Sequence, residues 1–354
     1  MTARALDVYL GANAAARIAA EGWNADAFRL LLGASGGPKW LILGELDRLL
    51  FGDFLAGQRQ QPLQVVGSSV GSWRHACLAQ ADPVAAIDRF EDIYVNWEYS
   101  ERPGEDEISA ASDAMLRHIL RERGAERLVT HPWLQSYIVT ARGRGLISAQ
   151  GKVALGAGMA TAALANGINR QLMAHLFQRV VFSSRGAPAL PFDDFATTQV
   201  ELTESSVTAA LHASGSIPFL LAGERDIPGA PNGHYWDGGI IDYHFAPEQL
   251  AGDGLVLYPH FRGDLTAGWF DKFLPWRRHQ RPRLADLVLL CPSDAFIASL
   301  PHGKIPDRSD FTGMAPAERL AYWRKCIDLS RELADDFAAR LRASDPLQDT
   351  RCLD

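Results

Sequence analysis

The chain of 354 residues has an apolar content of 47% and a charged content of 22%, as in ordinary soluble globular proteins. A chain of this length can bury a sizeable hydrophobic core, so a small domain of marginal stability is excluded. The net charge of −7 argues against nucleic acid as the main partner, and we expect none.

The first residues carry no charged segment followed by an apolar core, so we expect no signal peptide. Four cysteines are far apart and lack the spacing of metal ligands, so we expect mostly buried thiols, a cytoplasmic location and no metal or other cofactor. The longest uncharged run, 153–169, is too short and too weakly apolar to span a bilayer. The cysteines are Cys77, Cys291, Cys326 and Cys352.

Two units of strand, glycine-rich turn and helix follow one another near the start of the chain. A short helix is predicted first, over 12–21. The apolar run 28–33 predicts a buried strand, and 40–51 has the apolar spacing of an amphipathic helix. A second unit, over 63–80, repeats this order. The alternation predicts a parallel sheet flanked by helices, which is an α/β fold.

The rest of the chain shows no internal repeat and no convincing linker. We therefore predict a single domain over 1–354, with an N-terminal helical extension (1–27), a catalytic core (28–300) and a C-terminal helical segment (301–354) that packs on the core. Further helices are predicted at 83–98, 109–123, 167–178, 205–212 and 317–341, and further strands at 137–140, 179–182, 255–258 and 287–291.

The segment after the second predicted strand has the form of a nucleophile elbow. Its sequence, GSSVG over 67–71, stands between a β-branched run and a helix. In such an elbow a serine occupies a turn so tight that the residues two positions away must be nearly free of side chain, here Gly67 and Gly71. The pattern predicts Ser69 as a nucleophile. A second G-x-S-x-G match, centred on Ser35, is its rival.

Acyl transfer by a serine also needs hydrogen-bond donors for the oxygen that becomes an anion. Gly36 and Gly37 stand where a helix begins, and nothing blocks their backbone N–H groups. We expect these N–H groups, with that of Val70, to form the oxyanion hole. Lys39 ends the same turn, where it orients the loop or meets an anionic head group; a solvated surface lysine is the alternative.

A base must accept the hydroxyl proton. Residues 232–241 predict a short strand followed by the turn Asp237-Gly238-Gly239. We expect the carboxylate of Asp237 to be this base, with Gly238 and Gly239 giving the turn its close approach. The alternative is a turn in which the carboxylate only caps its own backbone.

Four blocks of the sequence together resemble the patatin-like phospholipases. That family has a glycine-rich turn ending in Arg or Lys, a G-x-S-x-G elbow, an A-S-x-x-x-P block and a D-G-G or D-G-A turn. Residues 35–39, 67–71, 213–218 and 237–239 match these blocks in order. The resemblance implies a three-layer α/β/α fold with a mainly parallel sheet and a Ser–Asp dyad without histidine. It also implies hydrolysis of fatty-acyl esters, commonly of phospholipids.

The sequence departs from the family in two places. Ser35 stands where the family usually has glycine, and 240–244 lacks the usual asparagine. A histidine-dependent triad is the competing mechanism: Ser69, then Asp226 or Asp237, then His244 or His260 follow the order of ordinary α/β hydrolases. The competing functions are a non-lipid carboxylesterase or acyltransferase with the same serine, and an inactive lipid-binding protein of the same fold.

One further segment, 269–283, combines aromatic residues with a basic tail. Aromatic rings settle at the depth of lipid head groups and arginines attract anionic lipid, so this segment predicts peripheral contact with a membrane. The alternative is a set of core aromatics beside a solvated loop. The Gly- and Ala-rich stretch 153–167 predicts either the wall of an acyl groove or close helix packing.

Overall fold

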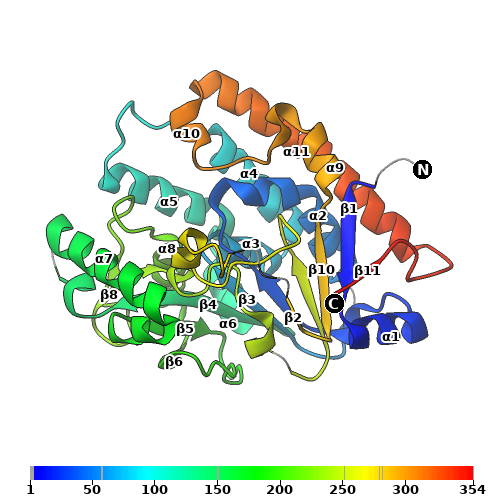
Figure 1. Cartoon of the computed structure of the whole chain (residues 1–354), viewed down its shortest axis with the longest axis horizontal. Coiled ribbons are helices and arrows are strands. Elements are labelled where there is room, and N and C mark those ends of the chain that lie inside the picture. Colours follow the sequence, from blue (N-terminus) through cyan, green and yellow to red (C-terminus); the bar gives the residue numbers. More distant parts are fainter. Residues whose placement is uncertain are drawn as a thin grey trace.

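One 11-stranded sheet, mostly parallel, forms the centre of the part of the chain that the computed structural model describes. The structure describes residues 4–56, 59–149, 151–250, 252–278, 280 and 282–353, so residues 1–3 and 354, and within 269–283 His279 and Arg281, lie outside it. The strand order is β11-β1-β10-β9-β2-β3-β4-β5-β6, with β8 paired to β4 and β7 to β8. Helices flank the sheet (Figure 1), and the predicted three-layer α/β/α fold is confirmed.

The strands β9, β2, β3 and β4 run parallel at the middle of the sheet. The pairs β1–β10, β4–β5, β4–β8 and β7–β8 are antiparallel. Both ends of the described chain meet at one edge, where β11 pairs with β1 (Figure 1). The strands are β1 (Leu6–Leu10), β2 (Phe28–Gly33), β3 (Leu63–Ser68), β4 (Leu134–Gly143), β5 (Phe177–Ser183), β6 (Thr197–Glu201), β7 (Glu224–Arg225), β8 (His234–Asp237), β9 (Leu255–Pro259), β10 (Leu287–Pro292) and β11 (Arg351–Cys352).

The helices connect these strands and cover the sheet. The α-helices are α1 (Ala12–Glu21), α2 (Gly44–Leu49), α3 (Val70–Leu78), α4 (Pro83–Asn96), α5 (Glu105–Leu120), α6 (Gly124–Thr130), α7 (Lys152–Ile168), α8 (Glu204–Gly215), α9 (Asp294–Ser299), α10 (Asp310–Gly313) and α11 (Pro316–Leu341). Short 3-10 or π turns are η1 (Ala25–Ala27), η2 (Gly37–Leu43), η3 (Leu50–Phe54), η4 (Gly145–Ile147), η5 (Arg170–His175), η6 (Gly238–Ile240), η7 (Pro247–Leu250), η8 (Trp269–Phe273) and η9 (Pro301–Gly303).

The main core lies between the sheet and the helices α2, α3, α4 and α11. Trp40 stacks on Phe90 with ring centroids 4.3 Å apart, and α11 packs against α2 and α4. An ion pair is buried in the same layer: Arg74 of α3 donates two hydrogen bonds of 2.6 Å to Asp47 of α2. A smaller apolar cluster, which includes Leu155 of α7, lies under α7 and η8. The smaller cluster reaches the sheet at Ala141 of β4, Phe177 of β5 and Trp236 of β8.

Several predicted elements differ from the observed ones. The N-terminal extension is not only helical, because 6–10 forms β1, and the edge strand β6 was not predicted. The helix expected near 167–178 begins much earlier, as α7, and is followed by η5. Within α7, Leu155, Met159 and Ala162 form one buried face that stabilises the helix. The stretch expected as one helix over 40–51 divides among η2, α2 and η3.

Candidate active site

Strand register brings the three glycine-rich turns to one edge of the sheet. Gly33 at the end of β2 pairs with Gly67 near the end of β3, so the first turn and the elbow leave the sheet side by side. The next strand, β4, pairs in parallel with β3, and its Thr140 faces Asp237 at the end of the antiparallel β8. Residues far apart in sequence therefore meet at the carboxyl ends of the central strands, where ligands bind in open α/β sheets.

The elbow is as tight as its glycines predict. Ser69 has φ 55° and ψ −133°, a conformation that costs a residue with a side chain about 1–3 kcal/mol. A Cβ on Gly67 would lie 2.6 Å from the backbone nitrogen of Ser72, and a Cβ on Gly71 would overlap the carbonyl oxygen of Gly33. The two glycines thus permit the close contact of strand and helix that turns the Ser69 side chain out of the sheet.

Two serines of the 213–218 block fix the elbow and the Asp237 turn relative to each other. The Ser69 N–H donates to Ser214 Oγ at 2.9 Å, and the Ser214 hydroxyl donates to the carbonyl of Val139 on β4 at 2.7 Å. The Asp237 N–H donates to the carbonyl of Ser216 at 2.8 Å. Ser214 is wholly buried. Sequence reasoning placed this block in a family pattern without assigning its residues a physical task; here they position the elbow and the Asp237 turn.

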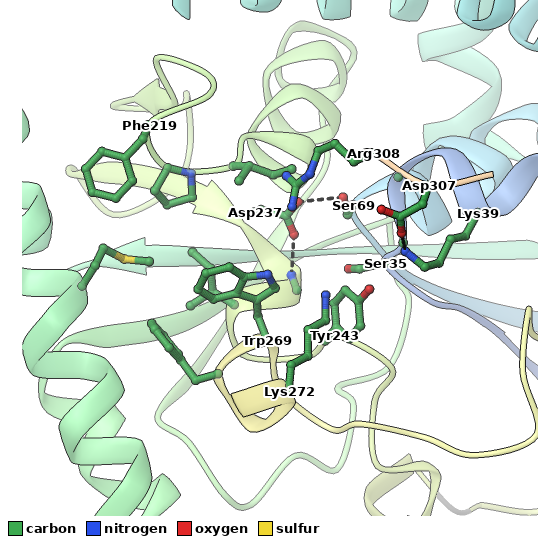
Figure 2. A pocket seen from close by; sticks show the side chains of 18 residues that line it. Ser35, Lys39, Ser69, Phe219, Asp237, Tyr243, Trp269, Lys272, Asp307 and Arg308 are labelled. Carbon is green, nitrogen blue, oxygen red and sulfur yellow. Dashed lines mark hydrogen bonds and ion pairs between the residues drawn. The ribbon is translucent and has the colours of Figure 1, made fainter. Parts of the chain in front are cut away.

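The side chains of Ser69 and Asp237 point toward each other and meet in the pocket (Figure 2). The Ser69 hydroxyl donates to Asp237 Oδ2 at 2.7 Å, and the Gly239 N–H donates to Oδ1 at 2.7 Å. Ser69 is 7% exposed and Asp237 6% exposed. Burial raises the pKa of Asp237 to about 6, while the hydrogen bonds from Ser69 and Gly239 oppose that rise. The carboxyl group is therefore poised to exchange a proton near neutral pH.

The predicted oxyanion donors lie beside this pair. Gly36 and Gly37 line the pocket. Gly37 begins η2 and Val70 begins α3, and the first N–H groups of a helix have no acceptor within it. The rival serine, Ser35, makes different contacts. Its hydroxyl donates to Ser68 Oγ at 3.0 Å, so it faces another hydroxyl rather than a carboxylate.

Lys39 does not project freely into the pocket. It forms an ion pair with Asp307, which precedes α10 (Figure 2). Burial raises the pKa of Asp307, but the hydrogen bonds from Lys39 and Ser309 and the charge of Lys39 together lower that pKa to about 2. This contact joins the turn that carries Gly36 and Gly37 to the C-terminal part of the chain.

A cavity of about 280 Å³ opens beside Ser69. One wall is apolar, with Met159 of α7, Phe219 after α8 and Trp269 of η8. The other side carries Lys272 and Arg308. Sequence reasoning did not place either cation here, because Ser69 and Lys39 stand more than two hundred residues before both of them in sequence and no local pattern links them.

The segment 269–283 divides into two parts. Trp269 and Phe270 line the pocket, and Phe270 is buried. Phe273 and Trp276 are 67% and 65% exposed. The first aromatics thus form part of the site, while the later ones lie at the surface. His279 and Arg281 of this segment lie outside the described residues.

The histidines proposed for a triad lie in the core. Burial and the neighbouring His260 lower the pKa of His244, and burial lowers that of His260 to about 3. His244 Nδ1 accepts from the Thr266 N–H at 3.1 Å. Asp226 accepts from the backbone N–H of the turn that precedes β8. None of these side chains lines the Ser69 pocket within the described residues.

A mostly parallel sheet flanked by helices, with a serine on the tight turn after a strand, is typical of α/β hydrolases. A family model described as "Patatin-like phospholipase" matches residues 34–247, more than half of the chain, and the protein belongs to this family. The solved structure of VipD from Legionella pneumophila is similar, with a TM-score of 0.32 and 13% identity over 92% of this chain and 71% of that one. Comparison with curated proteins gave no match.

Proposed function

We propose that the protein is a serine lipid acyl hydrolase of the phospholipase A or lysophospholipase type. The Ser69 oxygen attacks the acyl carbonyl as Asp237 accepts the hydroxyl proton, and N–H groups of Gly36, Gly37 and Val70 stabilise the oxyanion. The proton passes to the leaving alcohol as the ester C–O bond breaks. Water then hydrolyses the acyl-enzyme. The 2.7 Å hydrogen bond between Ser69 and Asp237 within the pocket carries this proposal.

The electrostatics support a dyad without histidine. An ordinary aspartate with a pKa of 3.8 is a weak base, but burial raises the pKa of Asp237 to about 6, closer to neutral pH. The buried His244 and His260 make no hydrogen bond to Ser69 or Asp237 in the described residues. The structural alternatives are a carboxylesterase or acyltransferase that uses the same serine, or a lipid-binding protein without turnover.

A test of the nucleophile uses a fluorophosphonate probe followed by peptide mapping. We expect an adduct on Ser69 and none in Ser69→Ala, whereas Ser35→Ala keeps the adduct. An adduct on Ser35, or no adduct on the folded wild-type protein, would refute the assignment. A panel of short-chain esters and of phospholipids with labelled acyl chains then separates a lipase from an esterase. Absence of turnover throughout would leave the lipid-binding alternative.

We also propose that the enzyme reaches its substrate at a membrane surface. Exposed apolar side chains gather on α7, where Val153 is 88%, Leu164 71% and Ile168 78% exposed. They lie opposite the buried face of α7, and η8, with the exposed Phe273 and then Trp276 after it, packs beside that helix. No helix among the described residues is long and apolar enough to cross a bilayer. Contact with one leaflet would cover this surface instead.

Liposome flotation tests this contact. We expect the wild type to float with vesicles that contain anionic lipid, and Leu164→Glu with Ile168→Glu to remain in solution. Ala339→Glu, on the exposed side of α11, adds the same kind of charge away from α7 and serves as the control. Equal flotation of all three proteins would exclude α7 as the contact. We further infer a cytoplasmic location, which the four unpaired cysteines support.

A further inference from the structure

Two cations enter the Ser69 pocket from parts of the chain that the family match does not reach. Lys272 comes from η8 and Arg308 from the segment before α10, whereas the match ends at residue 247. Both side chains point toward the middle of the pocket, one on each side of Asp237 (Figure 2). Both act electrostatically on the Asp237 carboxylate. They are therefore close enough to meet a substrate bound at Ser69.

The carboxylates of the pocket attract these two cations but make their hydrogen bonds and ion pairs with other groups. Asp307 is paired with Lys39, and Asp237 accepts hydrogen bonds from Ser69 and Gly239. Within the described residues, neither Lys272 nor Arg308 forms an ion pair. The contact that Lys272 does make is with an aromatic face: its Nζ lies 3.5 Å from the centre of the Tyr243 ring.

The surroundings of Lys272 disfavour its charged form. Burial, together with repulsion from Lys39 and Arg308, lowers the pKa of Lys272 to about 7. An anion placed between Lys272 and Arg308 would remove this repulsion and give both side chains charged acceptors. A proton-accepting role for Lys272 has less support, because the Ser69 hydroxyl already donates to Asp237 at 2.7 Å.

We propose that Lys272 and Arg308 form an anion-binding subsite that holds a phosphate or carboxylate group of the acyl ester close to the scissile bond. This proposal rests on the proposed function, since the anion is part of the substrate that Ser69 attacks. The apolar wall with Met159, Phe219 and Trp269 takes the acyl chain, and the cationic side takes the anionic group. The small cavity, about 280 Å³, places the two groups only a few bonds apart. Acyl esters with an anionic head group fit this arrangement better than neutral acylglycerols do.

The subsite is tested first without turnover, by calorimetric titration with inorganic phosphate and with glycerol 3-phosphate. We expect the wild type to bind both, and Lys272→Met or Arg308→Gln to bind roughly 10- to 100-fold more weakly, the range of a lost charge-assisted hydrogen bond. Arg278→Gln removes an exposed arginine outside the pocket and should bind like the wild type. Circular dichroism confirms that each variant is folded. No binding by the wild type, or equal binding by Lys272→Met, Arg308→Gln and the wild type, overturns the proposal.

A kinetic arm then identifies the source of the anion. We compare kcat/KM for three medium-chain esters that share one acyl group: a neutral monoacylglycerol, its phosphate monoester and an ester that carries a carboxylate. The wild type should prefer one or both anionic esters, and the anionic-to-neutral ratio should fall at least roughly tenfold in Lys272→Met and Arg308→Gln. An unchanged ratio contradicts the subsite. Wild-type protein that binds phosphate but hydrolyses no ester would contradict the proposed function instead, so the two failures are distinguishable.

Discussion

Replacement of Asp237 by asparagine should abolish turnover and yet stabilise the protein at neutral and alkaline pH. The buried carboxyl group has a folded-state pKa of about 6 against an ordinary value of 3.8. Because the folded-state pKa is the higher one, the stability that this group contributes is present below about pH 3.8 and is lost as the pH rises through about 6. At about 1.4 kcal/mol per pKa unit, this difference corresponds to about 3 kcal/mol at pH 8.

Asparagine has the same shape and carries no charge, and its side-chain oxygen can still accept from the Gly239 N–H. We therefore expect Asp237→Asn to exceed the wild type in unfolding free energy by about 1–3 kcal/mol at pH 8, and the gain to vanish near pH 4. Urea unfolding at several pH values, with equal slopes for both proteins, measures the gain. Asp193→Asn removes an exposed carboxylate and is the control. A gain that does not grow with pH would refute the electrostatic reasoning, and residual turnover would refute the role of Asp237 as base.

Three further predictions follow from the same contacts. Hydrolysis of a neutral short-chain ester should rise with pH through about 6, because Asp237 must be ionised to accept the proton; a flat pH–rate profile between about pH 5 and 8 would contradict this. Gly71→Ala places a Cβ against a backbone carbonyl, and should lower the unfolding free energy by about 1–3 kcal/mol in urea titrations, whereas Gly104→Ala, with open space around it, should not. Asp47→Asn leaves the buried charge of Arg74 without its counter-ion and should lower the unfolding free energy by about 3–5 kcal/mol in the same titrations. The double variant Asp47→Leu with Arg74→Met should recover most of that loss.

The elements that sequence reasoning predicted best are those whose cause is local. A β-branched run, two glycines at fixed spacing and a following helix specify the turn at Ser69, because only glycine tolerates the neighbouring close contacts. The spacing of apolar residues likewise predicts the long helix α11 from the sequence. Strand β1 was missed although Leu6, Val8 and Leu10 alternate with more exposed residues, since five residues give a weak signal.

The parts that sequence reasoning missed depend on contacts between distant segments. In the sequence, Lys272 belongs to a segment of aromatic and basic residues that was interpreted as a surface segment. Only the packing of η8 beside the pocket shows that Lys272 lies near Asp237. Arg308 lies in a stretch that matched no pattern. Lys39 was expected to orient its loop or meet a head group, and the partner that occupies it, Asp307, is more than two hundred residues away in sequence. Such pairings depend on the tertiary fold and produce no periodic pattern in the sequence.

The pocket therefore combines two kinds of residue with different origins in the chain. The region that matches the family, 34–247, carries Ser69, Asp237 and the glycine turn, whose strand ends place them together. Later segments carry Lys272 and Arg308, and the ion pair between Lys39 and Asp307 holds one of these segments against the glycine turn. Because Ser69 and Asp237 depend on sheet register while the cations depend on η8 and the stretch before α10, we expect changes in the later segments to alter which ester the proposed site binds without displacing the Ser69–Asp237 hydrogen bond.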